Sequence, residues 1–220
     1  MSTAPQTLTD EDVIKLLIIL LSGFGTEQRK KKSVRNYTMA VLMLDAGLRV
    51  GEVVQIHAVD LWFNNAPVTS VLIPAKIAKN NQTRQIPVSV RLSNALKEMY
   101  QCYWSKVEPF GSYRAFYNSN PSESLTTRQV ERIIRSASMK ALGYPIHPHM
   151  LRHTFASNLM RITNIRTVQE LLGHKHLTST QVYTHPNEND KIKAIACMQD
   201  VCVDTTSVLD RLRTAARTPD

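Results

Sequence analysis

The hydrophobic positions along the chain recur mainly with the spacing of α-helices. The first such segment follows Thr9, a residue suited to cap a helix N-terminus, and its apolar stripe runs through Val13, Leu16, Leu17 and Leu20. Apolar spacing and turn residues together predict further helices at positions 34–46, from 50, 91–104, 127–142, 150–161, 167–172, 178–184 and 190–201.

The segment between positions 61 and 90 breaks this pattern. Residues 68–73 and 85–90 are typical of two short strands, and the polar residues 79–82 between them predict a turn. We therefore expect a mainly α-helical fold with a small antiparallel β-sheet, in the α+β class. Among the helix caps we expect Ser93 for the helix at 91–104 and Thr126 or Thr127 for the helix that ends near 142.

Composition narrows the class of protein. A chain of 220 residues with 43% hydrophobic and 20% charged residues suits a soluble globular domain. The odd number of cysteines, at Cys102, Cys197 and Cys202, argues against a disulfide scaffold and against a zinc knuckle. The longest apolar run, 16–21, is too short to cross a bilayer, and no secretory signal opens the chain. We expect a cytoplasmic protein with no membrane partner.

The charge balance points to a polyanion. Lys and Arg number 27 against 18 Asp and Glu, a formal net charge of +9, which favours binding to nucleic acid. The basic run 29–32 is interpreted as a solvated loop between helices, with phosphate contact as the alternative. Arg128, Arg132 and Arg135 recur at helical spacing, so they form either a DNA-facing surface or a solvated helix face.

Candidate chemistry concentrates in the second half of the chain. Residues 147–153 contain three histidines and Arg152; His174 and Tyr183 follow. His149 and His153 are four residues apart and could face one metal ion on a helix. The glutamate of the helical zinc motif is missing, however, and Arg152 would set a cation beside the ion, so zinc is disfavoured. Each residue alone has an ordinary structural interpretation; the combination is what carries information.

Four short segments, in order, carry a resemblance to a known family. Residues 48–52 (LRVGE), 149–153 (HMLRH), 171–174 (LLGH) and 183–185 (YTH) are similar to the successive boxes of the tyrosine recombinase, or phage integrase, family. The resemblance extends from about position 8 to position 185. Carried over position by position, it implies six catalytic residues: Arg49, Lys79, His149, Arg152, His174 and Tyr183.

The lysine has a nearby competitor, and the first box also contains a glutamate. The family uses a lysine in the turn of a β-hairpin between its two arginines, and Lys79 fits that place, with Lys76 as a nearby competitor. Glu52 matches the first box, and we interpret it as helix packing or as support for the site, without a part in the chemistry.

The resemblance also implies a reaction. Members of the family cleave and rejoin DNA site-specifically through a 3′-phosphotyrosyl intermediate, here at Tyr183, without metal, cofactor or ATP. It implies double-stranded DNA as partner, self-association as dimers or tetramers on DNA, and no small-molecule substrate. Two alternatives remain open at this point: a type IB topoisomerase, which would relax plasmids without a specific site, and a non-catalytic DNA-binding regulator, which would tolerate Tyr183→Phe.

The domain organisation expected from the resemblance is a catalytic domain at 1–187 and a C-terminal helix and tail at 188–220. The tail carries apolar residues at helical spacing, so it is either exchanged between protomers or folded back on its own core. The helical DNA-clamping domain that typically precedes the catalytic domain has no counterpart, which suits either a short recombinase resembling fimbrial invertases or an excised fragment. A bacterial or mobile-element origin is the default for the family.

Overall fold

The computed structural model describes residues 7–23, 26–107 and 113–174. Seven α-helices and two strand pairs fall in these ranges, which confirms the expected mainly helical fold with small antiparallel sheets. The bounds are α1 Asp10–Leu21, α2 Glu27–Asp45, α3 Val50–Val53, β1 Trp62–Phe63, β2 Ala66–Pro67, β3 Ser70–Ile73, β4 Arg84–Pro87, α4 Val90–Cys102, α5 Thr127–Leu142, α6 Pro148–Met160 and α7 Ile165–Leu172. The helices expected at 178–184 and 190–201 lie outside the described residues. No helix in the described ranges is long and apolar enough to cross a membrane.

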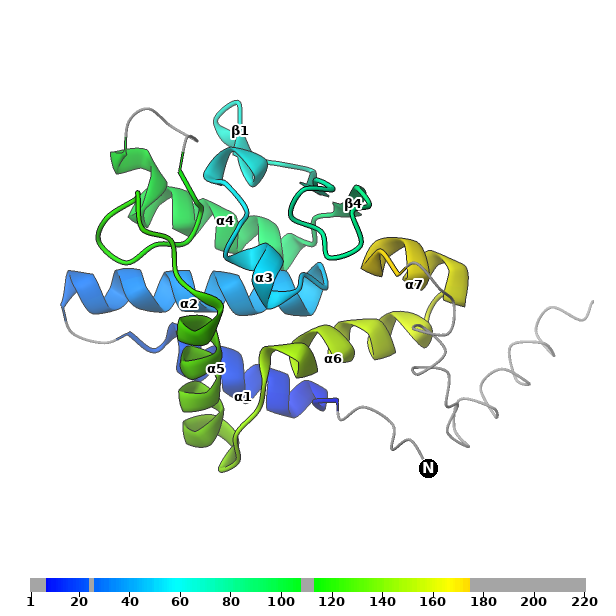
Figure 1. Cartoon of the computed structure of the whole chain (residues 1–220). Coiled ribbons are helices and arrows are strands. Elements are labelled where there is room, and N and C mark those ends of the chain that lie inside the picture. Colours follow the sequence, from blue (N-terminus) through cyan, green and yellow to red (C-terminus); the bar gives the residue numbers. More distant parts are fainter. Residues whose placement is uncertain (1–6, 24–25, 108–112, 175–220) are drawn as a thin grey trace, which may run out of the picture. The chain divides into compact units, whose positions relative to one another are not determined.

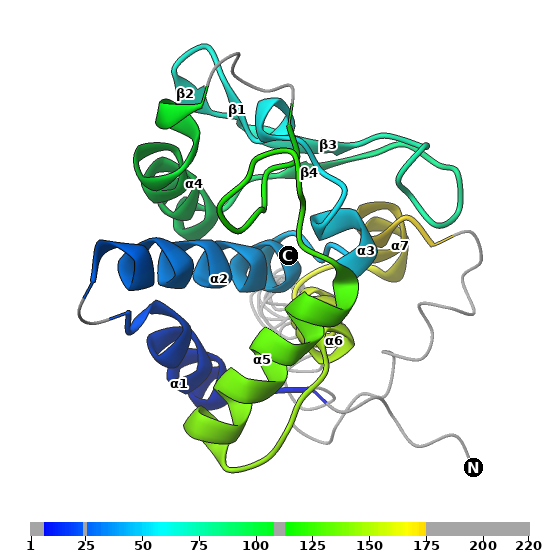
Figure 2. The same cartoon turned by 60° about the vertical axis from the view of Figure 1, so that its left-hand side comes forward.

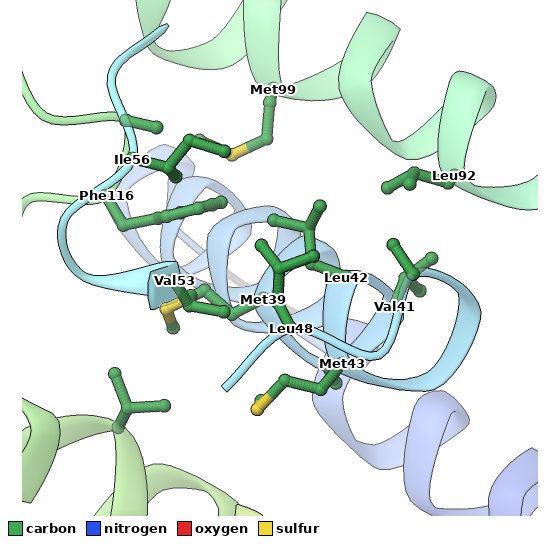
Figure 3. Packing of buried hydrophobic residues seen from close by; sticks show 14 of the residues in the cluster. Met39, Val41, Leu42, Met43, Leu48, Val53, Ile56, Leu92, Met99 and Phe116 are labelled. Atoms are coloured by element: carbon green, nitrogen blue, oxygen red, sulfur yellow. The ribbon is translucent and has the colours of Figure 1, made fainter. Parts of the chain in front are cut away.

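Helix α2 is the centre around which the others pack. Helix α4 covers one side of it, and α1, α5 and α6 lie on the other side (Figures 1 and 2). Its central residues Met39, Leu42 and Met43 are fully buried, and they meet side chains from α4, α3 and the 115–117 segment (Figure 3). Burial on both sides explains why nearly every residue from 38 to 44 is apolar and no amphipathic stripe is visible there.

The aromatic residues around α4 are packed into the core. Trp62 stacks on Tyr100 with ring centroids 4.2 Å apart, which gives it a structural role. The aromatic side chains that follow α4 are also buried, namely Tyr103, Trp104, Tyr113, Phe116 and Tyr117. Trp104 donates its indole N–H to the carbonyl oxygen of Ala115 at 3.0 Å, so the polar edge of the largest buried side chain is satisfied.

The start of α2 was predicted wrongly. The helix begins at Glu27, so the basic run 29–32 forms its first turns and is not a loop. Thr26 caps it by accepting the backbone N–H of Arg29, and Lys and Arg are good helix formers, so the polar run extends the helix although it lacks a continuous apolar stripe.

One helix cap is corrected, another is decided between its two candidates, and one hairpin was not predicted. Helix α4 begins at Val90 and its cap is Ser89, whose hydroxyl accepts the Leu92 N–H at 3.0 Å; Ser93 lies inside the helix. For α5, Thr126 is the cap, one of the two residues proposed. A short hairpin, β1–β2, was missed: Asn64 and Asn65 both adopt positive φ, the backbone that a two-residue hairpin loop requires.

The expected strand pair exists and projects its connecting loop from the helical body. Strands β3 and β4 pair antiparallel with Ser70 opposite Pro87 and Ile73 opposite Arg84 (Figure 2). Each strand is four residues long, shorter than predicted, and the loop between them carries positions 74–83. Val71, Ile73, Arg84 and Ile86 are buried, because alternate side chains on paired strands share one face.

Gly47 makes the turn that ends α2 and leads to Arg49. Its φ is +59°, and a Cβ added there would lie 2.4 Å from Cδ1 of Phe155. A side chain at this position therefore meets both a backbone strain and a steric clash. The turn orients the chain so that the Gly47 carbonyl oxygen accepts a hydrogen bond from Arg152.

Three glycine substitutions separate the free-energy cost of backbone strain from that of the steric clash. We expect Gly47→Ala to lower the free energy of unfolding by about 2–5 kcal/mol, from left-handed strain plus overpacking. Gly143→Ala has positive φ but open space around its Cβ, so it should cost about 1–2 kcal/mol. Gly51→Ala meets neither problem inside α3 and should be neutral or stabilising by up to about 1 kcal/mol. Urea denaturation measures all three, and equal losses for Gly47→Ala and Gly143→Ala would contradict this account.

Candidate active site

Arg49 stands at the N-terminus of α3, directly after the Gly47 turn. Its backbone N–H donates to Oε2 of Glu52 at 2.7 Å, and its guanidinium Nη1 donates to Oε1 of the same carboxylate at 3.1 Å. The side chain keeps 16% of its surface exposed. One carboxylate thus fixes both ends of Arg49, and the guanidinium can still reach solvent.

Glu52 is the buried anion of the site. Its side chain is 1% exposed, and Arg84 binds it with two parallel bonds, Nη1 to Oε1 at 2.8 Å and Nη2 to Oε2 at 2.6 Å. Burial alone would raise the pKa of Glu52, but the hydrogen bonds and charge of Arg84, the Arg49 backbone and the charge of Arg152 outweigh it and hold the pKa below its usual value. Glu52 is therefore ionised, and its interpretation as support for the site agrees with these contacts.

Arg84 was not singled out in the sequence. It lies on β4 with 6% of its surface exposed, and beyond its bonds to Glu52 it donates Nε to the carbonyl oxygen of Leu171 at 3.1 Å. A Cβ on Gly173 would lie 2.9 Å from Cδ of Arg84, so the glycine allows the close approach. Arg84 consequently links β4 to α3 and to the end of α7.

Arg152 lies in α6 with 4% of its surface exposed. Its Nη1 donates to the carbonyl oxygen of Gly47, and its Nη2 donates to that of Leu172 at 2.8 Å. Leu172 is the last residue of α7, where the helix dipole is negative, and Gly47 lies in the turn that follows α2, so a helix end and a turn carbonyl stabilise the buried cation. The guanidinium is held in place by backbone atoms.

His174 follows Gly173, which ends α7 with positive φ. Burial, followed by the charges of Arg152, Arg49 and Arg84, lowers the pKa of His174 to about 4. Nε2 lies 3.3 Å from Nη2 of Arg152, and since a guanidinium only donates, this nitrogen accepts. The imidazole is therefore neutral at pH 7 with its proton on Nδ1.

His149 lies in the first turn of α6, with its side chain open to solvent. Desolvation by the surrounding protein, then the charges of Arg152 and Arg49, lower its pKa; Glu131 opposes them, and Lys79 adds a smaller lowering. A neutral imidazole at pH 7 can accept a proton. The ring centroid of His153 is 6.4 Å away, and within the described residues no group of three or more potential ligands could hold a metal ion, so the zinc interpretation gains no support there.

The two candidate lysines lie near different histidines. Lys79 is close enough to His149 for its charge to contribute to the lowered pKa of that histidine. Lys76 acts in the same way on His57, after burial and Arg114, which lower the pKa of His57 more. Lys79 is thus the lysine beside the histidine and arginine cluster. Asn80, its neighbour, donates Nδ2 to the carbonyl oxygen of Gly173 at 2.9 Å.

The structure brings Arg49, His149, Arg152 and His174 together, with Lys79 at the edge. The charges of both arginines act on both histidines, which places the four groups around one region. Tyr183 lies outside the described residues. Beside this region, a hollow on α5 is lined by the three arginines noted at helical spacing, Arg128, Arg132 and Arg135, together with His147. All three arginines are exposed on one face of α5.

The lowered pKa of His174 has a consequence for stability. An unfolded histidine titrates near 6.5, so between pH 6.5 and 4 the unfolded chain binds a proton that the folded chain excludes, and unfolding becomes more favourable as the pH falls. We expect the wild type to lose about 1–2 kcal/mol more than His174→Gln between pH 7.5 and 5. Urea denaturation at both values measures this; equal losses in the two proteins would show that His174 does not titrate this way.

Comparisons with known proteins place the chain in a family. Residues 6–190 match the model of the phage integrase family. A tyrosine recombinase of Pseudothermotoga lettingae is 34% identical over 168 residues, which are 74% of this chain and 54% of that protein. The crystal structure of XerA recombinase superposes with a TM-score of 0.70 at 24% identity, over 90% of this chain and 66% of the other.

A Tn1549 transposon integrase in complex with circular intermediate DNA has a TM-score of 0.67 at 21% identity, over 91% of this chain and 69% of the other. The chain spans about half the length of the curated relatives it matches. The ordered boxes, the fold and the match over residues 6–190 together show that this chain belongs to the phage integrase family of tyrosine recombinases.

Proposed function

We propose that this chain carries the catalytic centre of a site-specific DNA recombinase that cleaves and rejoins DNA through a 3′-phosphotyrosyl bond at Tyr183. The observation that carries the proposal is the cluster of two fixed guanidinium groups and two neutral imidazoles, with a hairpin lysine at its edge. Family membership supports it, because the matched range of 6–190 includes position 183.

Arg49 and Arg152 suit the binding of a scissile phosphate. A phosphodiester repels nucleophiles because it is an anion, and paired guanidinium donors neutralise its non-bridging oxygens and stabilise the additional charge of the transition state. Both groups are held by Glu52 or by backbone carbonyls before any substrate arrives, so little reorganisation accompanies binding. His174 would donate a hydrogen bond from its Nδ1–H to a phosphate oxygen and so add a third contact to the phosphate.

Proton transfer would use His149 and Lys79. The Tyr183 hydroxyl oxygen attacks phosphorus while its proton passes to the neutral His149 imidazole. The bond from phosphorus to the 5′ oxygen breaks, that oxygen leaves with the bonding electron pair, and Lys79 protonates it to a 5′ hydroxyl. Religation reverses these transfers: a 5′ hydroxyl attacks the phosphotyrosine and restores the phosphodiester. One phosphoester bond replaces another at each step, so no ATP is required.

Double-stranded DNA is the proposed partner. The net charge of +9 and the three exposed arginines on α5 supply cations for phosphates near the site. The related transposon integrase is bound to DNA. We further propose that protomers associate on DNA, since exchange of strands between two sites needs two cleaved duplexes held together.

Covalent trapping tests the function. The protein is incubated in EDTA with a pool of nicked duplexes from the DNA that flanks its gene, then resolved on a denaturing gel. We expect a protease-sensitive 3′ adduct with the wild type and none with Tyr183→Phe, while DNA binding stays within about two-fold because a single hydroxyl is removed. Arg152→Lys should reduce adduct formation by about 100-fold or more, since lysine lacks the planar pair of donors.

The outcomes separate the remaining functions. An adduct that survives Tyr183→Phe would refute the nucleophile assignment. Site-independent relaxation of a supercoiled plasmid would favour the topoisomerase. The non-catalytic regulator would be favoured if the wild type forms no adduct and the Tyr183→Phe protein still regulates its target normally.

A further inference from the structure

The end of α7 is held by side chains in an unusual way. Four consecutive backbone carbonyls, of residues 171 to 174, each accept a hydrogen bond from a different side chain. The donors are Arg84 to Leu171 at 3.1 Å, Arg152 to Leu172 at 2.8 Å, Asn80 to Gly173 at 2.9 Å and Gln169 to His174 at 3.0 Å. Carbonyls at a helix C-terminus lack partners within the helix, and water can satisfy them at an exposed end. Here the chain supplies the partners itself.

Two of the four donors come from the β3–β4 hairpin. Asn80 lies in the loop between β3 and β4, and Arg84 opens β4, so residues 80 and 84 fasten the lysine-bearing side of this loop to α7. Arg84 is buried and also binds Glu52, so its loss would disturb α3 as well as the contact between the loop and α7. Asn80 is half-buried, and its side chain makes a direct bond between the loop and the residue before His174.

Asn80 and Lys79 move together because they share a tight turn. The N–H of Asn81 donates to the carbonyl oxygen of Ala78 at 3.0 Å, which closes a four-residue turn with Lys79 and Asn80 at its centre. Asn81 then takes positive φ, at 51°, and reverses the chain. Lysine reaches its target through a flexible four-carbon stem, so the precision of its amine depends on where the backbone is held.

We propose that Asn80 is a positioning residue for Lys79: its hydrogen bond to the Gly173 carbonyl holds the lysine turn against the end of α7, directly before His174. The proposal rests on the proposed function, in which Lys79 protonates the leaving 5′ oxygen. The bond joins the loop that carries Lys79, the proposed proton donor, to the residue before His174, which would bind the phosphate. Lys79 and His174 would therefore be held in a defined position relative to the same phosphate.

The competing explanation is that Asn80 only caps α7. In that case its loss lowers stability, or disturbs His174, and slows cleavage whatever the leaving group. A positioning role through Lys79 predicts something narrower, because only the protonation step would suffer. A 5′-bridging sulfur in place of oxygen separates the two, since a thiolate leaves without a proton.

The experiment compares single-turnover cleavage of nicked duplexes that carry either 5′ oxygen or 5′ sulfur at the scissile bond. We expect Asn80→Ala to slow oxygen cleavage by about 10- to 100-fold and sulfur cleavage by no more than about 2-fold. Asn80→Asp should behave alike, since a carboxylate has the same shape and cannot donate to the carbonyl. Gln82→Ala, in an exposed position of the same loop, should match the wild type on both substrates. Equal slowing on both substrates, or none on oxygen, would overturn the proposal.

Reference variants make the failures distinguishable. Lys79→Ala should be restored by sulfur, and adding Asn80→Ala to it should slow oxygen cleavage by no more than about 2-fold, because a positioning residue has no effect once its target is gone. If Asn80→Ala slows oxygen cleavage in the Lys79→Ala background as much as it does in the wild type, Asn80 acts independently of Lys79 and the inference is overturned. If sulfur restores Lys76→Ala and leaves Lys79→Ala slow, the lysine assignment is wrong and the inference falls with it. A wild type that forms no adduct refutes the proposed function itself.

Discussion

The ionised Glu52 carboxylate, buried between Arg49 and Arg84, is the interaction on which the site depends. A phosphate-binding centre needs several cations close together, and before the substrate arrives those cations repel one another. Glu52 offsets this repulsion from inside the protein: it accepts three guanidinium contacts and the N–H that begins α3. Because its own surface is 1% exposed, the anion fixes the arginines without competing at the solvent-facing side where a phosphate would bind.

Backbone carbonyls offset the rest of the repulsion between the cations. The protonation states of the two histidines follow from the same concentration of positive charge. The last carbonyl of α7 and the Gly47 carbonyl in the turn after α2 hold Arg152, which has 4% of its surface exposed, so that cation needs no second buried carboxylate. The same concentration of positive charge lowers the pKa values of His149 and His174. The same arrangement, which in the proposed function would bind a phosphodiester, therefore also keeps one imidazole ready to accept a proton and the other ready to donate a hydrogen bond from Nδ1.

The sequence predicted the fold class, and the candidates that it singled out include Arg49, Arg152, His149 and His174, which the structure brings together; what it missed has physical causes. Thr9 and the stripe after it identify α1, because capping and apolar period agree. The start of α2 was missed because its basic first turns have no apolar period. Arg84 had a usable signal: alternation places it on the inward face with Ile86, and a buried cation requires a carboxylate such as Glu52. Asn80 had none, because its bond depends on where α7 packs.

The central claim, that the charge of Glu52 holds the cation cluster together, is tested most directly by the free energy of unfolding of Glu52→Gln. The amide keeps the shape but leaves Arg84 buried without its counter-charge, so we expect a loss of about 3–5 kcal/mol in urea denaturation at pH 7.5. Glu131→Gln, an exposed carboxylate near His149, is the matched control and should change stability by less than about 0.5 kcal/mol. A variant too unstable to fold agrees with the account, whereas Glu52→Gln within about 1 kcal/mol of the wild type would contradict it.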